Sequence, residues 1–291
     1  MKSNSLLMDL FLFFGQKKLA WSFRRLFCPV KKDALVLEVG SGGSPYFRSN
    51  VLIDAYESTR ERHWAPLITD RPSLLGFGEA LPFKDNAFDF VIASHVLEHS
   101  SNPDFFLKEL QRVAKAGYIE TPDAFMERIN PYWDHRSEVT IQDNQLLIRK
   151  KENWIVDNYL VGLYEAKAKK IIAESTIPNN PFEFHTRYLW QGKIDYVIEN
   201  STVLADWEAP NFNQPYTPKK TFRSSINDIA LKFIRMLFSQ HLRNKKINLN
   251  ALLICPKCKS DKLAFNNTVI CCLSCSSEYE CKNGIPKMFA S

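Results

Sequence analysis

The chain has 291 residues, a length that suits one mid-sized domain and a small one, or two modest domains. Its hydrophobic content of 45% and charged content of 24% are near the average of globular proteins, which argues against a largely disordered chain. The net charge of +6 is mild and does not demand a nucleic acid or another anionic partner. Six of the seven cysteines lie between Cys255 and Cys281, so the pattern indicates a local metal site in a reducing, cytoplasmic compartment rather than a disulfide scaffold.

An apolar run opens the chain, from Leu6 to Phe14, interrupted by Asp9. It is too short to span a bilayer, which takes about 20 apolar residues, and the sequence from Gly15 to Lys18 is no signal-peptide cleavage site. We predict one amphipathic helix that runs to about Phe27 and packs on the domain. The alternative is a helix that lies at a membrane interface and makes the protein membrane-peripheral.

Short apolar runs then alternate with amphipathic stretches. The runs of strand length cover residues 35–39, 51–54, 88–93 and 118–120. Runs of this kind, bounded by turn signals, suit the buried strands of a parallel sheet. A helix precedes the last run, with Asn102 as its cap, Pro103 in its first turn and Gly117 as its stop signal. The alternation predicts βαβ units and an α/β fold.

After Pro122 the pattern changes to that of hairpins. Residues 139–149 predict one hairpin that turns at Asp143-Asn144, and residues 184–198 predict a second that turns at Gln191-Gly192. Between them we expect a helix over residues 164–174, and we expect both hairpins to extend the parallel sheet.

Three parts of the chain follow from composition. We predict an α/β domain over residues 1–208, with the N-terminal helix included. Residues 209–248 follow this domain. They contain a linker rich in proline and asparagine and then a basic amphipathic helix over residues 226–242. A small cysteine-rich domain covers residues 249–291.

A glycine turn follows the first predicted strand, in the segment from Glu38 through Gly40, Ser41 and Gly42 to Pro45. A dinucleotide site needs a third glycine, where Pro45 stands, and an acid about 20 residues further on, whereas Asp54 comes sooner. S-adenosylmethionine has no phosphate. It has a ribose diol whose hydroxyls can donate hydrogen bonds to Asp54, and an ammonium group that Glu38 can face. Either acid alone is more typical of an ordinary strand end or turn, but the two together, on successive strands, favour a ligand site, and we therefore predict S-adenosylmethionine as the cofactor.

Three segments resemble the type 11 branch of the class I methyltransferases, namely residues 38–42, the Leu-Pro-Phe-Lys-Asp-Asn-Ala-Phe-Asp segment at 81–89, and Ser-His-Val-Leu-Glu-His at 94–99. The resemblance implies a Rossmann-like sheet and S-adenosylmethionine-dependent methyl transfer. It places the methionine group at Gly40, Ser41 and Gly42 and the ribose at Asp54. It places the adenine beside Glu79, Ala80 and Leu81. It places the sulfonium above a floor that Ser94, His95 and Val96 form. The family often has an acid where Phe77 stands, so Phe77 is expected to stack on the adenine, or Glu79 to replace the acid.

Catalysis of methyl transfer rests on alignment of the acceptor with the sulfonium, and a base is needed only where the acceptor's proton is not acidic. The candidates are His95, Glu98 and His99 after the strand at 88–93, and His135 and His185 in the later half of the chain. We select His95 and His135. The alternative for each is a histidine that hydrogen bonds hold in a structural role.

The cysteine-rich tail contains two Cys-x-x-Cys motifs, Cys255/Cys258 and Cys272/Cys275, with thirteen residues between them. Two such motifs complete a tetrahedral, closed and therefore structural zinc site, which leaves Cys271 and Cys281 out. Residues 249–289 resemble the small zinc-ribbon activators that partner methyltransferases of RNA and translation factors. The resemblance implies a built-in subunit that stabilises the catalytic domain.

The leading hypothesis is an active methyltransferase that acts on a saccharide, a lipid-linked compound or another small molecule, because the basic residues are dispersed and no aromatic-basic nucleic-acid motif is present. The activator-like tail favours an RNA or protein acceptor instead. A third hypothesis, motivated by Phe77 and the missing base, is a cofactor-binding scaffold without catalysis. The sequence leaves the acceptor and the oligomeric state open.

Overall fold

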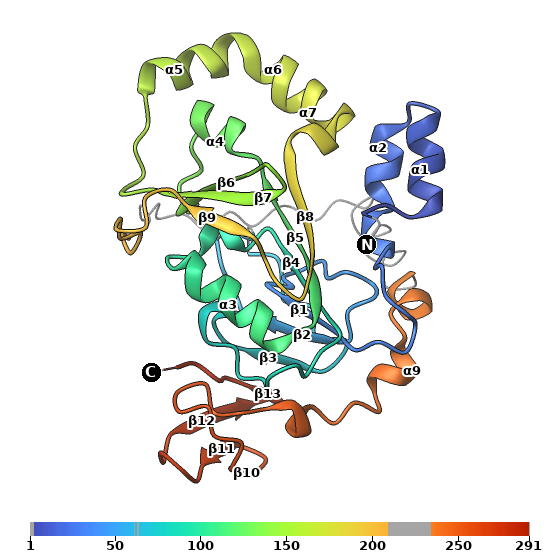
Figure 1. Cartoon of the computed structure of the whole chain (residues 1–291), viewed down its shortest axis with the longest axis vertical. Coiled ribbons are helices and arrows are strands. Elements are labelled where there is room, and N and C mark those ends of the chain that lie inside the picture. Colours follow the sequence, from blue (N-terminus) through green and yellow to red (C-terminus); the bar gives the residue numbers. More distant parts are fainter. Residues whose placement is uncertain (1–2, 61, 63, 209–233, 291) are drawn as a thin grey trace. The chain divides into compact units, whose positions relative to one another are not determined.

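A computed structural model gives the fold and describes residues 3–60, 62, 64–208 and 234–290 (Figure 1). The chain divides into two compact units. The first unit comprises Met1–Pro29, Ala93–Asp104 and Tyr118–Phe212, and the second comprises Val30–Ile92, Phe105–Gly117 and Asn213–Ser291. Neither unit is continuous in the sequence. At residues 92–93 and 117–118 the chain passes from one unit to the other inside a strand.

A six-stranded sheet has the order β3-β2-β1-β4-β5-β8. Its strands are β1 (Val36–Val39), β2 (Val51–Asp54), β3 (Ser73–Leu75), β4 (Phe90–Ser94), β5 (Ala116–Pro122) and β8 (His185–Gln191). Strands β1, β2 and β3 run parallel, and every residue of the three is buried. The predicted α/β class with a Rossmann-like sheet is confirmed. Strand β3 was not predicted, because three residues are too few for a recognisable apolar run.

Helix α3 (Pro103–Val113) supplies apolar side chains to the core of the second unit, and Phe106, Leu107 and Leu110 are buried. A short 3₁₀ helix, η2 (Gly78–Ala80), begins at a glycine because a side chain there would meet Phe106, whose Cε2 lies 2.3 Å from the position of a Cβ. The prediction that Gly117 stops this helix is wrong. The helix ends at Val113, and Gly117 already lies inside β5.

The N-terminal part of the first unit forms two helices, α1 (Leu6–Phe13) and α2 (Lys17–Ser22), followed by the 3₁₀ turn η1 (Arg24–Leu26). The prediction of one continuous helix is therefore wrong. Gly15 has φ +69, a left-handed conformation that ends the first helix and is open to glycine at little cost. Met8 and Ala20 are buried, whereas Leu6 is 81% and Phe13 83% exposed. Within the described residues, every helix is too short or too polar to cross a membrane.

A three-stranded sheet in the first unit has the order β6-β7-β9, with β6 (Ser137–Gln142), β7 (Gln145–Lys150) and β9 (Tyr196–Ile198). The first predicted hairpin is confirmed, because β6 and β7 pair antiparallel across a turn in which Asp143 and Asn144 both have positive φ. The second predicted hairpin is wrong. Strand β8 joins the six-stranded sheet, and β9 pairs in parallel with β7.

The helix expected over residues 164–174 is part of a longer helical stretch. It consists of α5 (Asn158–Leu163), the π-helical turn η4 (Tyr164–Ala168), α6 (Lys169–Ile171), a second π-helical turn η5 (Ile172–Thr176) and α7 (Ile177–Asn179). Asp157 caps its start by accepting hydrogen bonds from the backbone of Tyr159 and Leu160. Two further short helices belong to the first unit: α4 (Ala124–Ile129) and the 3₁₀ turn η6 (Pro181–Glu183).

The predicted linker and the start of the basic amphipathic helix lie outside the described residues. Residues 234–238 are helical, but Gln240 has φ +53 and separates them from α9 (His241–Asn244). The prediction of one helix through Leu242 is therefore wrong. The Asn50 amide donates to Gln240 and Asn244, so this segment is held on the second unit by polar contacts.

The cysteine-rich tail begins with the 3₁₀ turn η7 (Leu249–Leu252) and forms a four-stranded sheet of β10 (Leu263–Phe265), β11 (Val269–Cys272), β12 (Glu278–Lys282) and β13 (Ile285–Pro286). Its neighbouring strands are antiparallel. We call residues 249–289 the ribbon.

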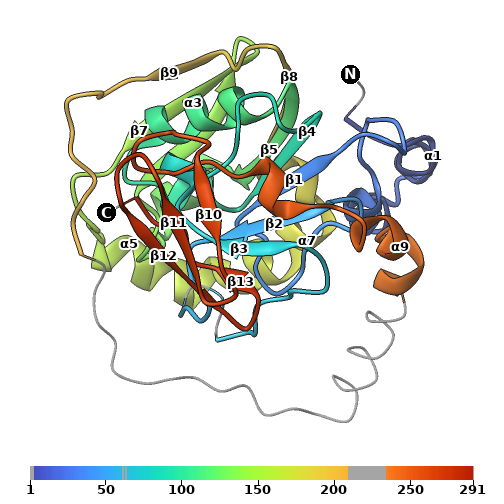
Figure 2. The ribbon, with the colours of Figure 1, turned by 90° about the horizontal axis from the view of Figure 1, so that it is seen from below.

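The ribbon lies against β3 within the second unit, as Figure 2 shows for β13. The backbone N–H of Met288 donates to the carbonyl of Leu75 at 2.7 Å, and that of Ile254 donates to the carbonyl of Pro82 at 3.0 Å. The side chains of Leu253, Ile254 and Met288 are buried. Backbone pairing and apolar burial together hold the ribbon on the parallel sheet.

Candidate functional site

The glycine turn leaves β1 in a left-handed conformation, with φ +69 at Gly40 and +57 at Gly42. The N–H of Gly40 donates to the carbonyl of Ile53 at 2.8 Å, which ties the turn to the neighbouring strand β2. Such a turn leaves backbone N–H groups at the carboxyl ends of two parallel strands, where open α/β sheets bind their ligands.

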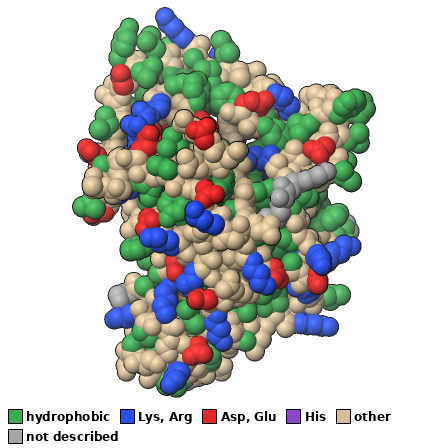
Figure 3. Space-filling model, in the orientation of Figure 1, with side chains coloured by type: hydrophobic (Ala, Val, Ile, Leu, Met, Phe, Trp, Pro, Cys, Tyr) green, Lys and Arg blue, Asp and Glu red, His purple; other side chains and the backbone are tan. Residues whose placement is uncertain are grey.

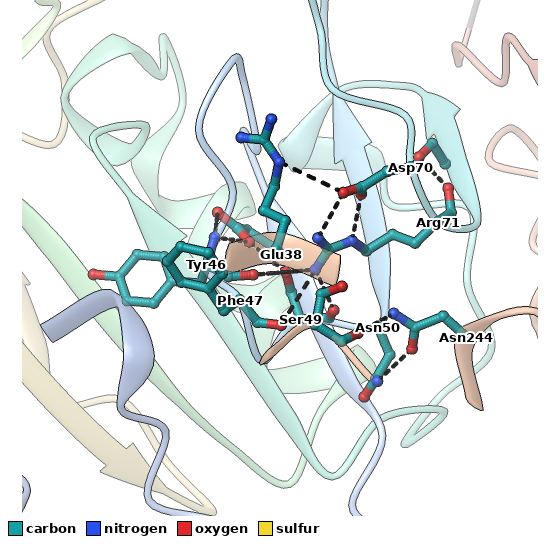
Figure 4. Close-up of polar contacts among 11 residues, drawn as sticks. Glu38, Tyr46, Phe47, Ser49, Asn50, Asp70, Arg71 and Asn244 are labelled. Carbon is teal, nitrogen blue, oxygen red and sulfur yellow. Dashed lines mark hydrogen bonds and ion pairs between the residues drawn. The ribbon is translucent and has the colours of Figure 1, made fainter. Parts of the chain in front are cut away.

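Glu38 is 3% exposed and holds the segment that follows the turn (Figure 4). Its carboxylate accepts hydrogen bonds from the backbone N–H of Tyr46 at 2.9 Å and from the Ser49 hydroxyl at 2.7 Å. The buried guanidinium of Arg71 donates to the carbonyl of Ser49 at 2.7 Å and pairs with Asp70. In this structure the Glu38 carboxylate therefore stabilises the loop between β1 and β2 through hydrogen bonds from Tyr46 and Ser49.

Asp54 ends β2 and contacts the glycine turn. Its carboxylate accepts hydrogen bonds from the backbone N–H of Gly42 at 2.9 Å and of Tyr56 at 3.0 Å, and from the Arg62 guanidinium at 2.7 Å. The acid and the turn are thus brought together, as expected for neighbouring parallel strands. The ion pair with Arg62 was not expected, because Arg62 belongs to the loop after β2.

One buried polar atom at the turn has no partner. Ser41 is 5% exposed, and its hydroxyl oxygen makes no hydrogen bond with any residue that the structure describes. An unpaired buried hydroxyl costs free energy unless a ligand or water completes its hydrogen bonds. The Ser41 hydroxyl and the backbone N–H groups of the glycine turn can bond to the methionine group of S-adenosylmethionine, and the Asp54 carboxylate can accept hydrogen bonds from its ribose.

The residues predicted to pass the adenine follow β3 in the same unit. Phe77 is 38% exposed, and its ring centroid lies 4.9 Å from that of Phe289 and 6.4 Å from that of Tyr56. Glu79 and Ala80 lie in η2, and Leu81 is fully buried. An aromatic group thus stands where the family has its acid, and one of its neighbours comes from the ribbon.

His95 follows β4 in the first unit and has φ +58, an uncommon conformation for a side chain of this size. Its Nε2 lies 3.4 Å from Oε1 of Glu120, and its Nδ1 lies 3.6 Å from Oε1 of Glu98. Burial opposes protonation, but the two carboxylates outweigh it and raise the pKa of His95 to about 9. At neutral pH His95 is an imidazolium, which donates hydrogen bonds and does not act as a base.

Glu120 lies in β5, two residues before its end, and is completely buried. Its carboxylate accepts hydrogen bonds from the Ser94 hydroxyl at 3.1 Å, the Tyr118 hydroxyl at 2.6 Å and the Arg24 guanidinium at 3.2 Å. Burial alone would raise its pKa, but His95 and Arg24 lower it overall, so Glu120 is ionised. Sequence reasoning missed Glu120. The signal was its place at the end of an apolar run, the same signal that selected Asp54.

His185 opens β8 and lies near His95, with ring centroids 5.5 Å apart. Its Nδ1 lies 2.8 Å from the carbonyl oxygen of Pro181, so Nδ1 carries the hydrogen and Nε2 remains able to accept a proton. Burial lowers the pKa of His185. The first unit therefore places a neutral histidine beside a charged one.

His135 belongs to a different group of side chains, in the loop after α4. It is 9% exposed, and its Nδ1 lies 2.7 Å from Oε2 of Glu127. Burial opposes its protonation, but Glu127 and neighbouring carboxylates raise the pKa of His135 overall. Its nearest imidazole is that of His99, with ring centroids 4.8 Å apart. The two histidines selected from the sequence, His95 and His135, thus lie in separate groups.

The four cysteines of the two motifs meet in the ribbon. The Sγ atoms of Cys255 and Cys275 are 3.6 Å apart, and those of Cys258 and Cys272 are 3.5 Å apart. Four sulfurs about 2.3 Å from one tetrahedral zinc would be separated by roughly 3.8 Å, so this spacing suits a metal ion. The cluster can hold a metal, and it does not include Cys271 or Cys281.

Residues 37–119 match the family described as Methyltransferase domain. The match covers β1 through most of β5, with the glycine turn, Asp54, His95 and Glu98. Residues 37–119 therefore form a domain of the class I, S-adenosylmethionine-dependent methyltransferase type. Within the family, residues 37–119 belong to the type 11 methyltransferase domains.

Individual relatives resemble parts of the chain. An uncharacterized protein of Methanocaldococcus jannaschii is 46% identical over 44 residues, which are 15% of this chain and 22% of that protein, so the match spans about a fifth of the relative's length. A structure of the Trm112 methyltransferase activator of Haloferax volcanii in complex with a methyltransferase shows 15% identity, covers 64% of this chain and 97% of the matched chain, and has a TM-score of 0.35. A methyltransferase of Aquifex aeolicus shows 22% identity over 38% of this chain and 73% of its own, with a TM-score of 0.26.

Proposed function

We propose that the second unit binds S-adenosylmethionine at the glycine turn. The main support is that the N–H of Gly42 donates a hydrogen bond to the carboxylate of Asp54 at 2.9 Å, so the glycine turn and the proposed ribose-binding acid lie side by side. In this proposal Gly40, Ser41 and Gly42 lie along the methionine group, and the unpaired hydroxyl of Ser41 gains a partner. Asp54 exchanges its contact with Arg62 for the ribose hydroxyls.

The proposed adenine site consists of Phe77, Glu79, Ala80 and Leu81, with Phe77 stacking on the ring in place of the family's acid. The similarity to the family extends the cofactor site to Ser94 and His95, at the end of β4. The bound cofactor supplies an electrophilic methyl group. The remaining steps belong to the side chains of the chain itself.

We infer different roles for the two neighbouring histidines of the first unit. His95, as an imidazolium between two carboxylates, donates hydrogen bonds and orients the acceptor. His185 is neutral, and its Nε2 receives the acceptor's proton as the acceptor atom bonds to the methyl carbon. Replacement of His185 by Gln should then lower turnover most above the pKa of His185, where the wild type has its base unprotonated, remove the fall of wild-type turnover at low pH that protonation of His185 causes, and leave cofactor affinity unchanged.

We favour a saccharide, a lipid-linked compound or another small molecule as the acceptor. We call His95, Glu120 and His185 the His95 group. Aromatic and cationic side chains gather around it: the Arg24 guanidinium, which pairs with Glu120, lies 4.0 Å from the Trp21 ring centroid, and that of Arg187 lies 5.0 Å from the Phe182 centroid. Rings and hydrogen-bond donors in alternation suit a small polar molecule. On the face drawn in Figure 3, basic and acidic side chains are interspersed, which does not favour a nucleic-acid surface.

The exposed apolar side chains of α1 favour the lipid-linked form of this acceptor. Leu6, Leu10 and Phe13 are each more than half exposed, and Lys17 and Lys18 follow directly. Apolar side chains beside lysines suit the surface of an anionic membrane. In this proposal the helix makes peripheral contact with the bilayer that contains the acceptor.

The test is transfer of a labelled methyl group from S-adenosylmethionine into cell extract separated into small-molecule, lipid, RNA and protein fractions. Label in the small-molecule or lipid fraction, lost with Asp54→Ala, supports the proposal. Label in RNA or protein replaces the proposed acceptor with the alternative. Cofactor binding without label in any fraction identifies a scaffold.

We further propose that Cys255, Cys258, Cys272 and Cys275 bind one structural zinc ion and that the ribbon serves as a built-in stabilising subunit. Support comes from the sulfur spacing and from the pairing of the ribbon with β3. A segment of about 40 residues rarely buries enough apolar surface to fold without a metal or a cross-link.

A further inference from the structure

Four chemically reactive side chains meet in the first unit, apart from the His95 group. Glu98 and His99 come from η3 (Leu97–His99), and Asp134 and His135 come from the loop after α4. The backbone N–H of Arg136 donates to the carbonyl of Glu98 at 2.7 Å, which ties the loop to η3. One ligand atom each from Glu98, His99 and His135 lies within 4.8 Å of the other two.

Two carboxylates in this group are buried without hydrogen bonds. Glu98 is 2% exposed and Asp134 is 4% exposed. None of their four carboxylate oxygens has a hydrogen-bond partner among the residues that the structure describes. Buried carboxylates without donors cost several kcal/mol unless a cation compensates them. Among the described residues, the group therefore contains two buried carboxylates whose oxygens no hydrogen bond compensates, and the nearest cation outside the group is His95, whose Nδ1 lies 3.6 Å from Glu98.

The imidazole of His99 offers an Nδ1 that makes no hydrogen bond and can serve as a metal ligand. Nδ1 of His99 is buried without a hydrogen-bond partner among the described residues, and it lies 3.6 Å from Oδ2 of Asp134. Two atoms that share one ion at about 2.1 Å are roughly 3 to 3.5 Å apart, so this spacing is close to that of a shared ion.

Glu127 orients the second imidazole in the way that metal sites require. It accepts a hydrogen bond from Nδ1 of His135 at 2.7 Å, and Lys151 and the backbone of Tyr132 donate to its other oxygen at 2.6 and 2.9 Å. With Nδ1 engaged, the free lone pair of His135 is on Nε2. A carboxylate behind a metal-binding histidine is the usual device that fixes its tautomer and ring orientation.

We propose that Glu98, His99 and His135, with Asp134 as a fourth ligand, bind a divalent transition-metal ion, for which Zn²⁺ is the best match. Two imidazoles with carboxylates form a donor set typical of zinc and of neighbouring transition metals, whereas calcium and magnesium prefer oxygen ligands throughout. The ion compensates both buried carboxylates and fastens the loop to η3. This site shares no ligand with the cysteine cluster, and it adjoins the proposed cofactor site through Glu98, which lies 3.6 Å from Nδ1 of His95.

The competing explanation is that imidazolium groups alone compensate the carboxylates, since Nδ1 of His95 also lies 3.6 Å from Glu98. The number of bound ions decides between the two. The full chain is equilibrated with buffered Zn²⁺, freed of unbound metal and analysed for zinc per chain. We expect two ions in the wild type, one in His99→Gln, one in Cys258→Ser, and two in the control His241→Gln, whose histidine lies in α9.

A wild-type measurement keeps the test independent of whether His99→Gln folds. Co²⁺ is added to the chain whose cysteines already hold Zn²⁺. One equivalent should bind and produce visible d–d absorption without the thiolate-to-cobalt charge-transfer band that cysteine ligands cause. Saturation of the wild type at one zinc, no absorption on adding cobalt, or two zinc ions retained by folded His99→Gln would each overturn the proposal.

Discussion

Met288 offers a direct test of how the ribbon is attached. Its side chain is fully buried, its N–H donates to the carbonyl of Leu75, and its own carbonyl lies 2.9 Å from where a Cβ on Gly76 would stand. Truncation of a buried Met to Ala removes the transfer free energy of its outer atoms and leaves a cavity, which costs about 2–5 kcal/mol. At about 3 kcal/mol, and with 2–4 °C per kcal/mol for a unit of this size, Met288→Ala should lower the Tm by roughly 6–12 °C.

The measurement is a thermal melt by calorimetry together with zinc per chain. Met288 is not a metal ligand, so the zinc content should stay unchanged while the Tm falls. Leu273→Ala is the matched control, since Leu273 belongs to the same ribbon but is 69% exposed. A Met288→Ala protein that melts with the control would refute the attachment of the ribbon to β3.

Four further outcomes are expected. Cys258→Ser should lose the ribbon's zinc and lower the Tm, whereas Cys281→Ser, which changes a cysteine outside the cluster, should keep both; equal zinc in the two variants contradicts the ligand assignment. Asp54→Ala should weaken S-adenosylmethionine binding by about 1–3 kcal/mol in titration calorimetry, since the ribose loses its acceptor, and unchanged affinity removes Asp54 from the site. The pKa of His95 rises from 6.5 to about 9 on folding, so its stabilisation is complete below pH 6.5 and is lost as the pH rises through 9; denaturant melts of His95→Gln should show a shallower fall over that range, and a parallel fall speaks against the shift. The protein should bind no NAD in the same calorimeter, because Pro45 occupies the place of the third glycine, and tight binding would reverse this conclusion.

Local patterns predicted the local features of the fold. The apolar run at Val51–Asp54 is β2 to the residue, and the Asp143-Asn144 turn joins β6 to β7. The approach of Asp54 to the glycine turn could also be predicted, because the carboxyl ends of neighbouring parallel strands share one edge of a sheet. In each case the physical cause lies within a few residues or in a general rule of strand pairing.

Features that depend on distant segments could not be predicted in this way. The pairing of Arg62 with Asp54 and of Arg24 with Glu120 requires the folded positions of loops and helices. The charge state of His95 follows from the folded positions of Glu98 and Glu120, so the sequence indicated a histidine at the site but not an imidazolium. The predicted hairpin over residues 184–198 included strand β9 but gave it the wrong partner, because its pairing with β7 depends on a segment about 50 residues away in the sequence.

Strand β3 is at the end of the six-stranded sheet, and the ribbon covers this edge through the pairing of Leu75 with Lys287. An uncovered edge strand of apolar residues is a template for pairing with other chains and hence for aggregation. During synthesis β3 emerges from the ribosome long before Lys287 does, so the edge strand of the nascent sheet remains unpaired until the ribbon has been made. The same contact that stabilises the complete protein therefore forms late, and a chain stopped before the ribbon should depend on chaperones to remain monomeric.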